Sequence, residues 1–252
     1  VGIFSGGTDF DPGPGVYSES SNGSTTAYIQ KLSASGTFEW VVPIIPVTAA
    51  TGKCTPKAVK TDAAGNVYMT GVSDGNLDYA AGTATQIVLG TYTNHDICVA
   101  KYDSAGNSLW AFRIGEWQHV ESVNDIAVDA NGNVYVTGTF DYIVDFNPDL
   151  NAAYVMTATG STYDAFVCKY DTDGNFVWAK RIGGTEYASV RSMDFNAAGE
   201  LILAGNFRST CDLDPDTATA LNVTANGSYD IFISALDTAG NLLWNKRIGN
   251  ST

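Results

Sequence analysis

Three short acidic motifs contain the residues of this chain whose type and spacing could do chemistry. Oxygen ligands at alternate positions are typical of calcium loops, because calcium binds about six to eight oxygen atoms. The motifs therefore predict calcium ligands, but no glutamate follows them at the spacing of an EF-hand loop. The open alternative is that Asp and Pro only shape turns. The candidate ligands are Asp9, Asp11, Asp145, Asn147, Asp149, Asp212, Asp214 and Asp216.

Other residues capable of catalysis are scattered or recur in equal copies. Asp96, Asp164 and Asp230 each open a β-prone run of the same pattern, and the histidines, His95 and His119, share no metal-ligand spacing. Catalysis requires one asymmetric group of residues, so equal copies favour a structural role. No Gly-x-Ser-x-Gly or His-Glu-x-x-His motif is present. We predict a protein that is not an enzyme, although carboxylates that converge only in space keep a glycosidase alternative open.

The elements that would position these residues follow from an internal repeat. A block Asp-x-x-Gly-Asn, closed by Thr-Gly, alternates with a block Lys-Tyr-Asp-x-x-Gly-Asn-x-x-Trp. A period of about 68 residues indicates stacked copies of one supersecondary unit. The recurring glycines and tryptophans are Gly2, Gly71, Gly138 and Gly205, and Trp40, Trp110, Trp178 and Trp244.

Each repeat is predicted to hold four antiparallel strands in two hairpins. In the third repeat we expect strands at 123–128, 134–140, 165–170 and 176–181. The hairpin turns read Asp-x-x-Gly-Asn, in which aspartate accepts backbone hydrogen bonds and glycine takes the positive φ of a type I turn with a G1 bulge. The strands are apolar on both faces, so each sheet must be covered on both sides. This favours an all-β fold of β-propeller blades over a parallel β-helix, whose rungs are shorter.

The repeat also predicts the domain organisation. Residues 1–252 form one propeller segment of about four blades, at 1–48 (partial), 49–116, 117–184 and 185–252. The first residues align with the middle of a strand, so we expect a piece of a longer parent, for example a seven-bladed one. Ring closure would then need missing parent residues or a second copy. The long connection 141–163 contains a β-prone stretch at 153–157 and predicts an extra hairpin or decorated loop on one rim.

These motifs resemble the SBBP-type β-propeller repeat of large secreted and surface proteins of bacteria, notably Bacteroidetes. The shared features are the Asp-x-x-Gly-Asn-Val-Tyr-Val-Thr-Gly block, the Asp-Phe-Asp-Pro element and the Trp-x-x-Arg-Ile-Gly ending. Asp78-Tyr-Ala-Ala in the second repeat and Ala235 in place of lysine in the fourth depart from the pattern. The resemblance implies the fold and an extracellular or cell-surface location, but no activity, since propellers host unrelated functions. A looser similarity to quinoprotein-type propellers implies that the recurring tryptophans dock adjacent blades.

The charge, the apolar stretches and the cysteine spacing of the chain limit the classes of partner and site that it can have. Thirteen basic and 27 acidic residues give a net charge of −14, which disfavours nucleic acid and anionic membranes as partners. The longest apolar stretch, 41–50, contains Pro43 and Pro46 and is too short to span a bilayer. Cys54, Cys98, Cys168 and Cys211 form no Cys-x-x-Cys pair, which excludes zinc-ribbon and thioredoxin sites and leaves their disulfide status open.

We therefore predict a non-enzymatic extracellular scaffold, adhesion or interaction module that binds a protein or a glycan. The alternative is a carbohydrate-active or quinoprotein-like propeller enzyme. Trp117 and Tyr187 follow the Arg-Ile-Gly element in successive repeats. These two aromatic residues could stack on a sugar or anchor a partner, or they could pack between blades.

Overall fold

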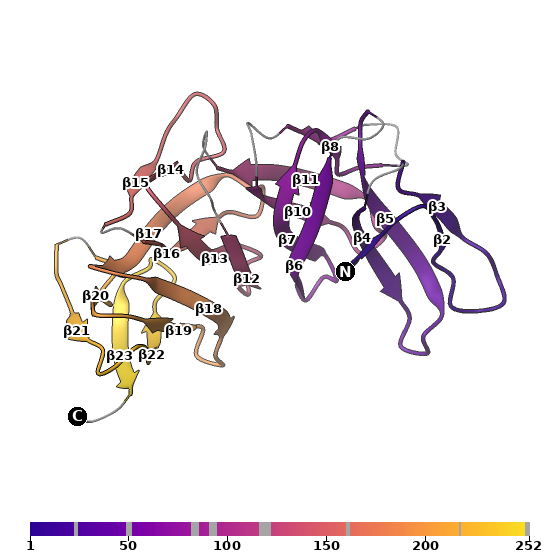
Figure 1. The fold of residues 1–252 in the computed structure, drawn as a ribbon. Coiled ribbons are helices and arrows are strands. Elements are labelled where there is room, and N and C mark those ends of the chain that lie inside the picture. Colours follow the sequence, from indigo (N-terminus) through magenta and orange to yellow (C-terminus); the bar gives the residue numbers. More distant parts are fainter. Residues whose placement is uncertain are drawn as a thin grey trace. The chain divides into compact units, whose positions relative to one another are not determined.

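All regular secondary structure in the described residues is β-strand, in antiparallel sheets (Figure 1). The computed structural model describes residues 1–22, 25–48, 52–81, 86–90, 95–115, 122–159, 162–216 and 218–249. Within these ranges we find no helix that is long and apolar enough to cross a membrane.

Three repeats form a four-stranded antiparallel core, as predicted, and the first repeat contributes three strands. The second repeat contains β6 (Lys53–Thr61), β7 (Val67–Asp74), β10 (Asp96–Tyr102) and β11 (Ser108–Ile114). The third contains β12 (Ser122–Val128), β13 (Val134–Phe140), β16 (Asp164–Tyr170) and β17 (Phe176–Gly184). The fourth contains β18 (Ala188–Phe195), β19 (Leu201–Phe207), β22 (Asp230–Leu236) and β23 (Leu242–Ile248). The first contains β1 (Gly2–Phe4), β4 (Thr26–Leu32) and β5 (Phe38–Pro46). The predicted all-β propeller-blade architecture is confirmed.

The hairpin turns form by the chemistry predicted from their sequence. In the third repeat, Gly132 has a φ of 82° and its amide donates to the Asp129 carbonyl oxygen over 2.9 Å. Asp129 Oδ1 accepts hydrogen bonds from the amides of Asn131 and Asn133, both at 2.9 Å. A side chain other than glycine would be strained at this φ, so the turn sequence fixes the register of β12 and β13.

Each repeat also contains a short extra hairpin, confirming the prediction for the connection after the second strand. These hairpins are β2 (Gly7–Asp9) and β3 (Ser18–Ser20), β8 (Leu77–Asp78) and β9 (Val88–Leu89), β14 (Ile143–Asp145) and β15 (Val155–Thr157), and β20 (Thr210–Asp212) and β21 (Asn222–Thr224). Two of them join the preceding blade, since β8 pairs with β5 and β20 pairs with β17. The sequence did not indicate this exchange between neighbouring repeats.

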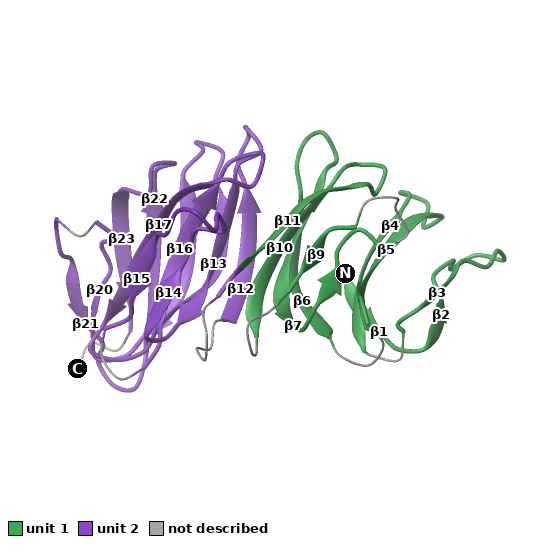
Figure 2. Ribbon diagram, turned by 90° about the horizontal axis from the view of Figure 1, so that it is seen from above, with its two compact units in different colours: residues 1–113 green, residues 114–252 purple. Residues whose placement is uncertain are grey.

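The chain divides into two compact units, Val1–Arg113 and Ile114–Thr252, coloured separately in Figure 2. Each unit holds two repeats with a core between their blades. In the second unit, Tyr135 and Val167 of the third repeat lie in one buried cluster with Leu203 and Phe232 of the fourth. In the first unit, Ile29 clusters with residues of the second repeat. Blades thus cover one another within each unit, whereas one continuous segment over 1–252 stays a prediction.

Two of the recurring tryptophans dock neighbouring blades, as predicted. Trp40 Nε1 and Lys31 Nζ both donate to the Ser104 carbonyl oxygen in the next repeat, over 3.2 and 3.0 Å. Trp178 Nε1 and Lys169 Nζ donate in the same way to the Thr238 carbonyl oxygen, over 3.3 and 3.0 Å. Each pair therefore ties a blade to the second hairpin turn of the blade that follows.

The four cysteines are free and buried. Cys54 and Cys98 have sulfur atoms 3.8 Å apart, but they lie on β6 and β10, which flank β7. Two strand spacings of about 4.8 Å each separate their backbones too widely for a disulfide without backbone movement. Burial raises the pKa of Cys168 to about 12. Burial also raises the pKa of Cys211 to about 12, with help from the negative charges of Asp164 and Asp212.

Candidate functional site

The first aspartate of each acidic motif closes an extra hairpin. Asp145 Oδ1 accepts hydrogen bonds from the amides of Asn147 and Tyr154, at 3.0 and 2.8 Å. Asp9 and Asp212 accept the equivalent pairs of hydrogen bonds at the loop ends of their own hairpins. Asp78 does the same although its motif lacks the second aspartate. The first position is therefore explained by turn formation.

The later positions of the motifs also bind local backbone. Asp11 Oδ1 accepts from the Gly13 amide, and Asn147 Oδ1 accepts from the amide of Asp149, whose own Oδ1 accepts from the Asn151 amide. Among the described residues, no group of three or more His, Cys, Asp or Glu side chains is arranged to hold a metal ion. Calcium binding at these motifs stays a prediction.

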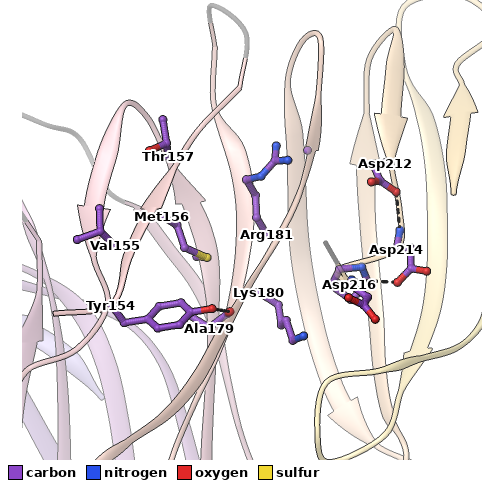
Figure 3. A pocket seen from close by; sticks show the side chains of 12 residues that line it. Tyr154, Val155, Met156, Thr157, Ala179, Lys180, Arg181, Asp212, Asp214 and Asp216 are labelled. Carbon is purple, nitrogen blue, oxygen red and sulfur yellow. Dashed lines mark hydrogen bonds between the residues drawn. The ribbon is translucent and has the colours of Figure 1, made fainter. Parts of the chain in front are cut away.

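The fourth-repeat motif lies in a pocket within the second unit (Figure 3). The pocket has a volume of about 300 Å³, at the lower end for small-molecule sites. One wall is the hairpin strand β15 of the third repeat with the adjoining Tyr154, the floor is β17, and the opposite wall is the acidic motif after β20. The lining residues are Tyr154, Val155, Met156, Thr157, Ala179, Lys180, Arg181, Gly183, Asp212, Asp214, Pro215 and Asp216.

The aromatic wall of the pocket is held rigidly. The Tyr154 hydroxyl donates to the Ala179 carbonyl oxygen over 3.1 Å, and its ring packs against Phe176 with centroids 4.8 Å apart. In the first repeat Tyr17 packs against Phe38 at the same separation. The aromatic pair is therefore a feature of the repeat, whereas the charges beside it are not.

The acidic wall is preorganised by its own hydrogen bonds. Asp214 Oδ1 accepts from the Asp216 amide over 3.0 Å, and Asp214 Oδ2 accepts from the Thr219 hydroxyl over 2.7 Å. Asp216 Oδ1 accepts from the Ala218 amide over 3.0 Å. These bonds fix both side chains, so the carboxylates need no reorganisation to receive a positively charged ligand group.

The two cations of the pocket, Arg181 and Lys180, differ in their ion pairing. Arg181 Nη1 donates to Asp164 Oδ2 over 2.8 Å and to the Thr159 hydroxyl over 2.6 Å. The charge of Arg181 is thus balanced by a buried carboxylate. For Lys180, no described acidic residue lies within ion-pair distance.

The equivalent junction in the first unit lacks the charges of Lys180, Arg181 and Asp214. Val42, Pro43 and Ile45 of β5 occupy the positions of Lys180, Arg181 and Gly183. Ala80 and Ala81 occupy those of Asp214 and Pro215. The charged pocket is therefore asymmetric between the two described junctions, and asymmetry is the property that separates a binding site from repeat-building residues.

The recurring aspartates at the start of the third strand form buried ion pairs. Asp96 pairs with Arg113, Asp164 with Arg181 and Asp230 with Arg247, with N–O separations of 3.0, 2.8 and 2.8 Å. The first repeat has Thr26 and Pro43 at these two positions, and Thr26 Oγ1 donates to the Ile44 carbonyl oxygen instead. Because aspartate and arginine are lost together, the pair is one structural unit of the blade.

The remaining sequence candidates are dispersed. His95 is exposed, with its Nε2 3.9 Å from Asp74 Oδ2, and Trp117 and His119 lie outside the described residues. The Tyr187 ring contacts Tyr229 and Arg191, all within the fourth repeat. Sequence reasoning missed Tyr154 and Lys180 because only the tertiary structure sets β15 and β17 against the fourth-repeat hairpin.

The sequence of the chain is similar to those of known proteins. A family model described as a beta-propeller repeat (SBBP) matches residues 115–139. The matched segment is thus similar to a β-propeller repeat, in keeping with the blades of the fold. The chain is 29% identical over 237 residues to the Regulatory protein FlaEY of Caulobacter vibrioides, which covers 92% of this chain and 24% of that protein. An uncharacterized WD repeat-containing protein of Acanthamoeba polyphaga mimivirus is 24% identical over 164 residues, 62% of this chain and 12% of that protein. This chain thus spans about a quarter or less of the curated relatives it matches.

Proposed function

We propose that this propeller segment is a non-enzymatic interaction module whose pocket receives a basic side chain of a partner protein. The observation that carries the proposal is the asymmetric acidic wall of Asp214 and Asp216 opposite Tyr154. A ring beside fixed carboxylates suits the aliphatic stem and charged end of lysine or arginine, which combine apolar contact with ion pairing.

Charge supports a cationic group over an anionic one. The pocket is lined by three aspartates, and Arg181 is already balanced by Asp164. The net charge of −14 would also steer basic partners towards the chain. The Caulobacter relative is named a regulatory protein, which is in keeping with a binding role.

We also propose that the module acts as a scaffold or adhesion element outside the cell or on a bacterial surface, within a larger parent. The acidic surface and the resemblance to repeats of secreted proteins support this location. Cell fractionation with an antibody against the native protein tests it, and recovery only in the cytoplasm would contradict it.

The pocket is tested by titrating the full chain with a fluorescent lysine hexapeptide at physiological salt. Asp216→Asn should weaken binding several-fold, because it removes one charge from the acidic wall. Lys180→Gln should strengthen it, because it removes the competing cation. Asp173→Asn is the matched control, since it removes an exposed carboxylate from a hairpin turn of the same unit.

Two results would overturn the proposal. One is equal weakening by Asp216→Asn and Asp173→Asn, which would show binding by overall charge alone. The other is tighter, Tyr154-dependent binding of neutral oligosaccharides in the same titration, which would assign the pocket to a glycan.

A further inference from the structure

A cluster of two arginines, two tyrosines and one glutamate lies at one end of the fourth blade, apart from the pocket lining. Tyr187 precedes β18, Arg208 follows β19, and Tyr229 precedes β22. Adjacent antiparallel strands bring these ends together, and the Arg208 amide donates to the Tyr187 carbonyl oxygen over 2.9 Å. We call Glu186, Tyr187, Arg191, Arg208 and Tyr229 the arginine–tyrosine cluster.

Each guanidinium group of the cluster lies over an aromatic ring. Arg191 is 5.9 Å from the Tyr187 ring centroid, and Arg208 is 5.2 Å from that of Tyr229. The two rings meet edge to face, with centroids 6.1 Å apart and an interplanar angle of 86°. Stacking holds the arginines in place while their N–H edges remain available for hydrogen bonds, so the cluster is preorganised.

One carboxylate of the chain already lies beside the cluster. Glu186 Oε2 lies 3.4 Å from Arg208 Nε, and the two side chains are 44% and 46% exposed. So long and exposed an ion pair contributes little to stability. Arg191 binds Asn206 Oδ1 through Nε and the Tyr187 hydroxyl through Nη2, which leaves further N–H groups. Carboxylates fit the open donor edges.

The cluster is particular to the fourth repeat. Arg191 occupies the bulge position of its first strand, where the third repeat has Asn124 and the second has Lys57. At the position of Arg208 the third repeat has Asp141 and the second has Asp74. The cluster is therefore not needed to form a blade, because the second and third repeats form blades without it.

We propose that the arginine–tyrosine cluster binds the carboxylate side chains of an acidic segment in a partner protein, with Glu186 as an internal competitor. An acidic peptide is favoured over an acidic polysaccharide because a guanidinium occupies one face of each tyrosine ring, which leaves less ring surface for stacking on a sugar. This binding is separate from that of the acidic pocket, which selects the opposite charge.

The experiment titrates the full chain with a fluorescent glutamate hexapeptide at physiological salt. Arg208→Gln should weaken binding about tenfold, as expected for loss of a charge-assisted contact. Arg208→Lys should weaken it nearly as much, because lysine lacks the planar fork. Glu186→Gln should strengthen binding, because it removes the carboxylate that competes for Arg208 Nε. Lys57→Gln is the control for an equal loss of charge on the first unit.

Circular dichroism of every variant verifies that it is folded. Weaker or unchanged binding by the Glu186→Gln protein would overturn the proposal, as would full rescue by Arg208→Lys. An oligomer of uronic acids that binds more tightly than the peptide, in an Arg208-dependent way, would overturn the assignment to a protein partner.

Discussion

The buried pair of Asp164 and Arg181 provides a quantitative test of how the blades are stabilised. Asp164 is fully buried and its Oδ2 lies 2.8 Å from Arg181 Nη1, whereas the arginine side chain is 31% exposed. Arg181→Met would remove the positive charge while keeping most of the apolar stem. Asp164 would then retain hydrogen bonds from Thr159 and, at 3.3 Å, from the Gly184 amide, without a balancing charge.

The size of the loss follows from the geometry. Two unit charges 2.8 Å apart attract by about 6 kcal/mol at an effective dielectric constant of about 20. In the intact pair, the cost of taking both charges out of water offsets most of this attraction. When one partner is lost, the desolvation cost of the remaining charge is no longer compensated, and breaking a buried pair in this way typically costs about 3–5 kcal/mol. Because solvent already reaches the arginine side chain, we expect Arg181→Met to lower the free energy of unfolding by an amount at the lower end of this range, about 3 kcal/mol. For a unit of this size that corresponds to a fall of about 6–12 °C in Tm.

The assay is urea unfolding followed by circular dichroism for Arg181→Met, Asp164→Thr and the double variant. Thr26 replaces the aspartate in the first repeat, so the structure already contains a blade without the ion pair. The double variant should therefore be more stable than Arg181→Met alone. If the double variant loses the sum of the two single losses, the two residues are not coupled and our account of the blade is wrong.

The remaining predictions concern docking, acidity, thiols and calcium. Trp178→Ala should destabilise the chain by about 3 kcal/mol in urea unfolding and Trp244→Ala by much less, because Trp244 is 39% exposed; equal losses would contradict the docking role. Burial by itself would raise the pKa of the turn residue Asp237, but hydrogen bonds from Asn241 and nearby amides outweigh it and lower the pKa. Its contribution to stability is therefore present above about pH 4 and lost as the pH falls further, and Asp237→Asn should flatten that part of the stability profile. The four buried thiols should react with a thiol reagent only after unfolding, and fast reaction of the native protein would refute their burial. If the acidic motifs bind calcium, the melting temperature should be higher in calcium than in EDTA; equal melting temperatures would leave the alternative that these residues only shape turns through their hydrogen bonds to local amides.

Much of the fold was determined by local sequence. The Asp-x-x-Gly-Asn turns need only a few consecutive residues, since one carboxylate satisfies the turn amides and one glycine adopts the positive φ. The strand 134–140 was therefore predicted with its observed bounds, Val134–Phe140. The period of the repeat likewise predicted blades that cover one another, which the shared core of the third and fourth repeats confirms.

Only the tertiary structure decided which repeats share an extra hairpin and where charges meet. Strand β20 of the fourth repeat pairs with β17 of the third repeat. The contact consists of two residue pairs, Gly183 with Asp212 and Gly184 with Cys211, and no local sequence pattern specifies them. That pairing sets Asp214 opposite Tyr154 and forms the pocket. The arginine–tyrosine cluster likewise depends on three strand ends converging. Turn chemistry acts between neighbours in the chain, whereas a binding site depends on distances between residues far apart in it, and these are fixed only when the blades pack.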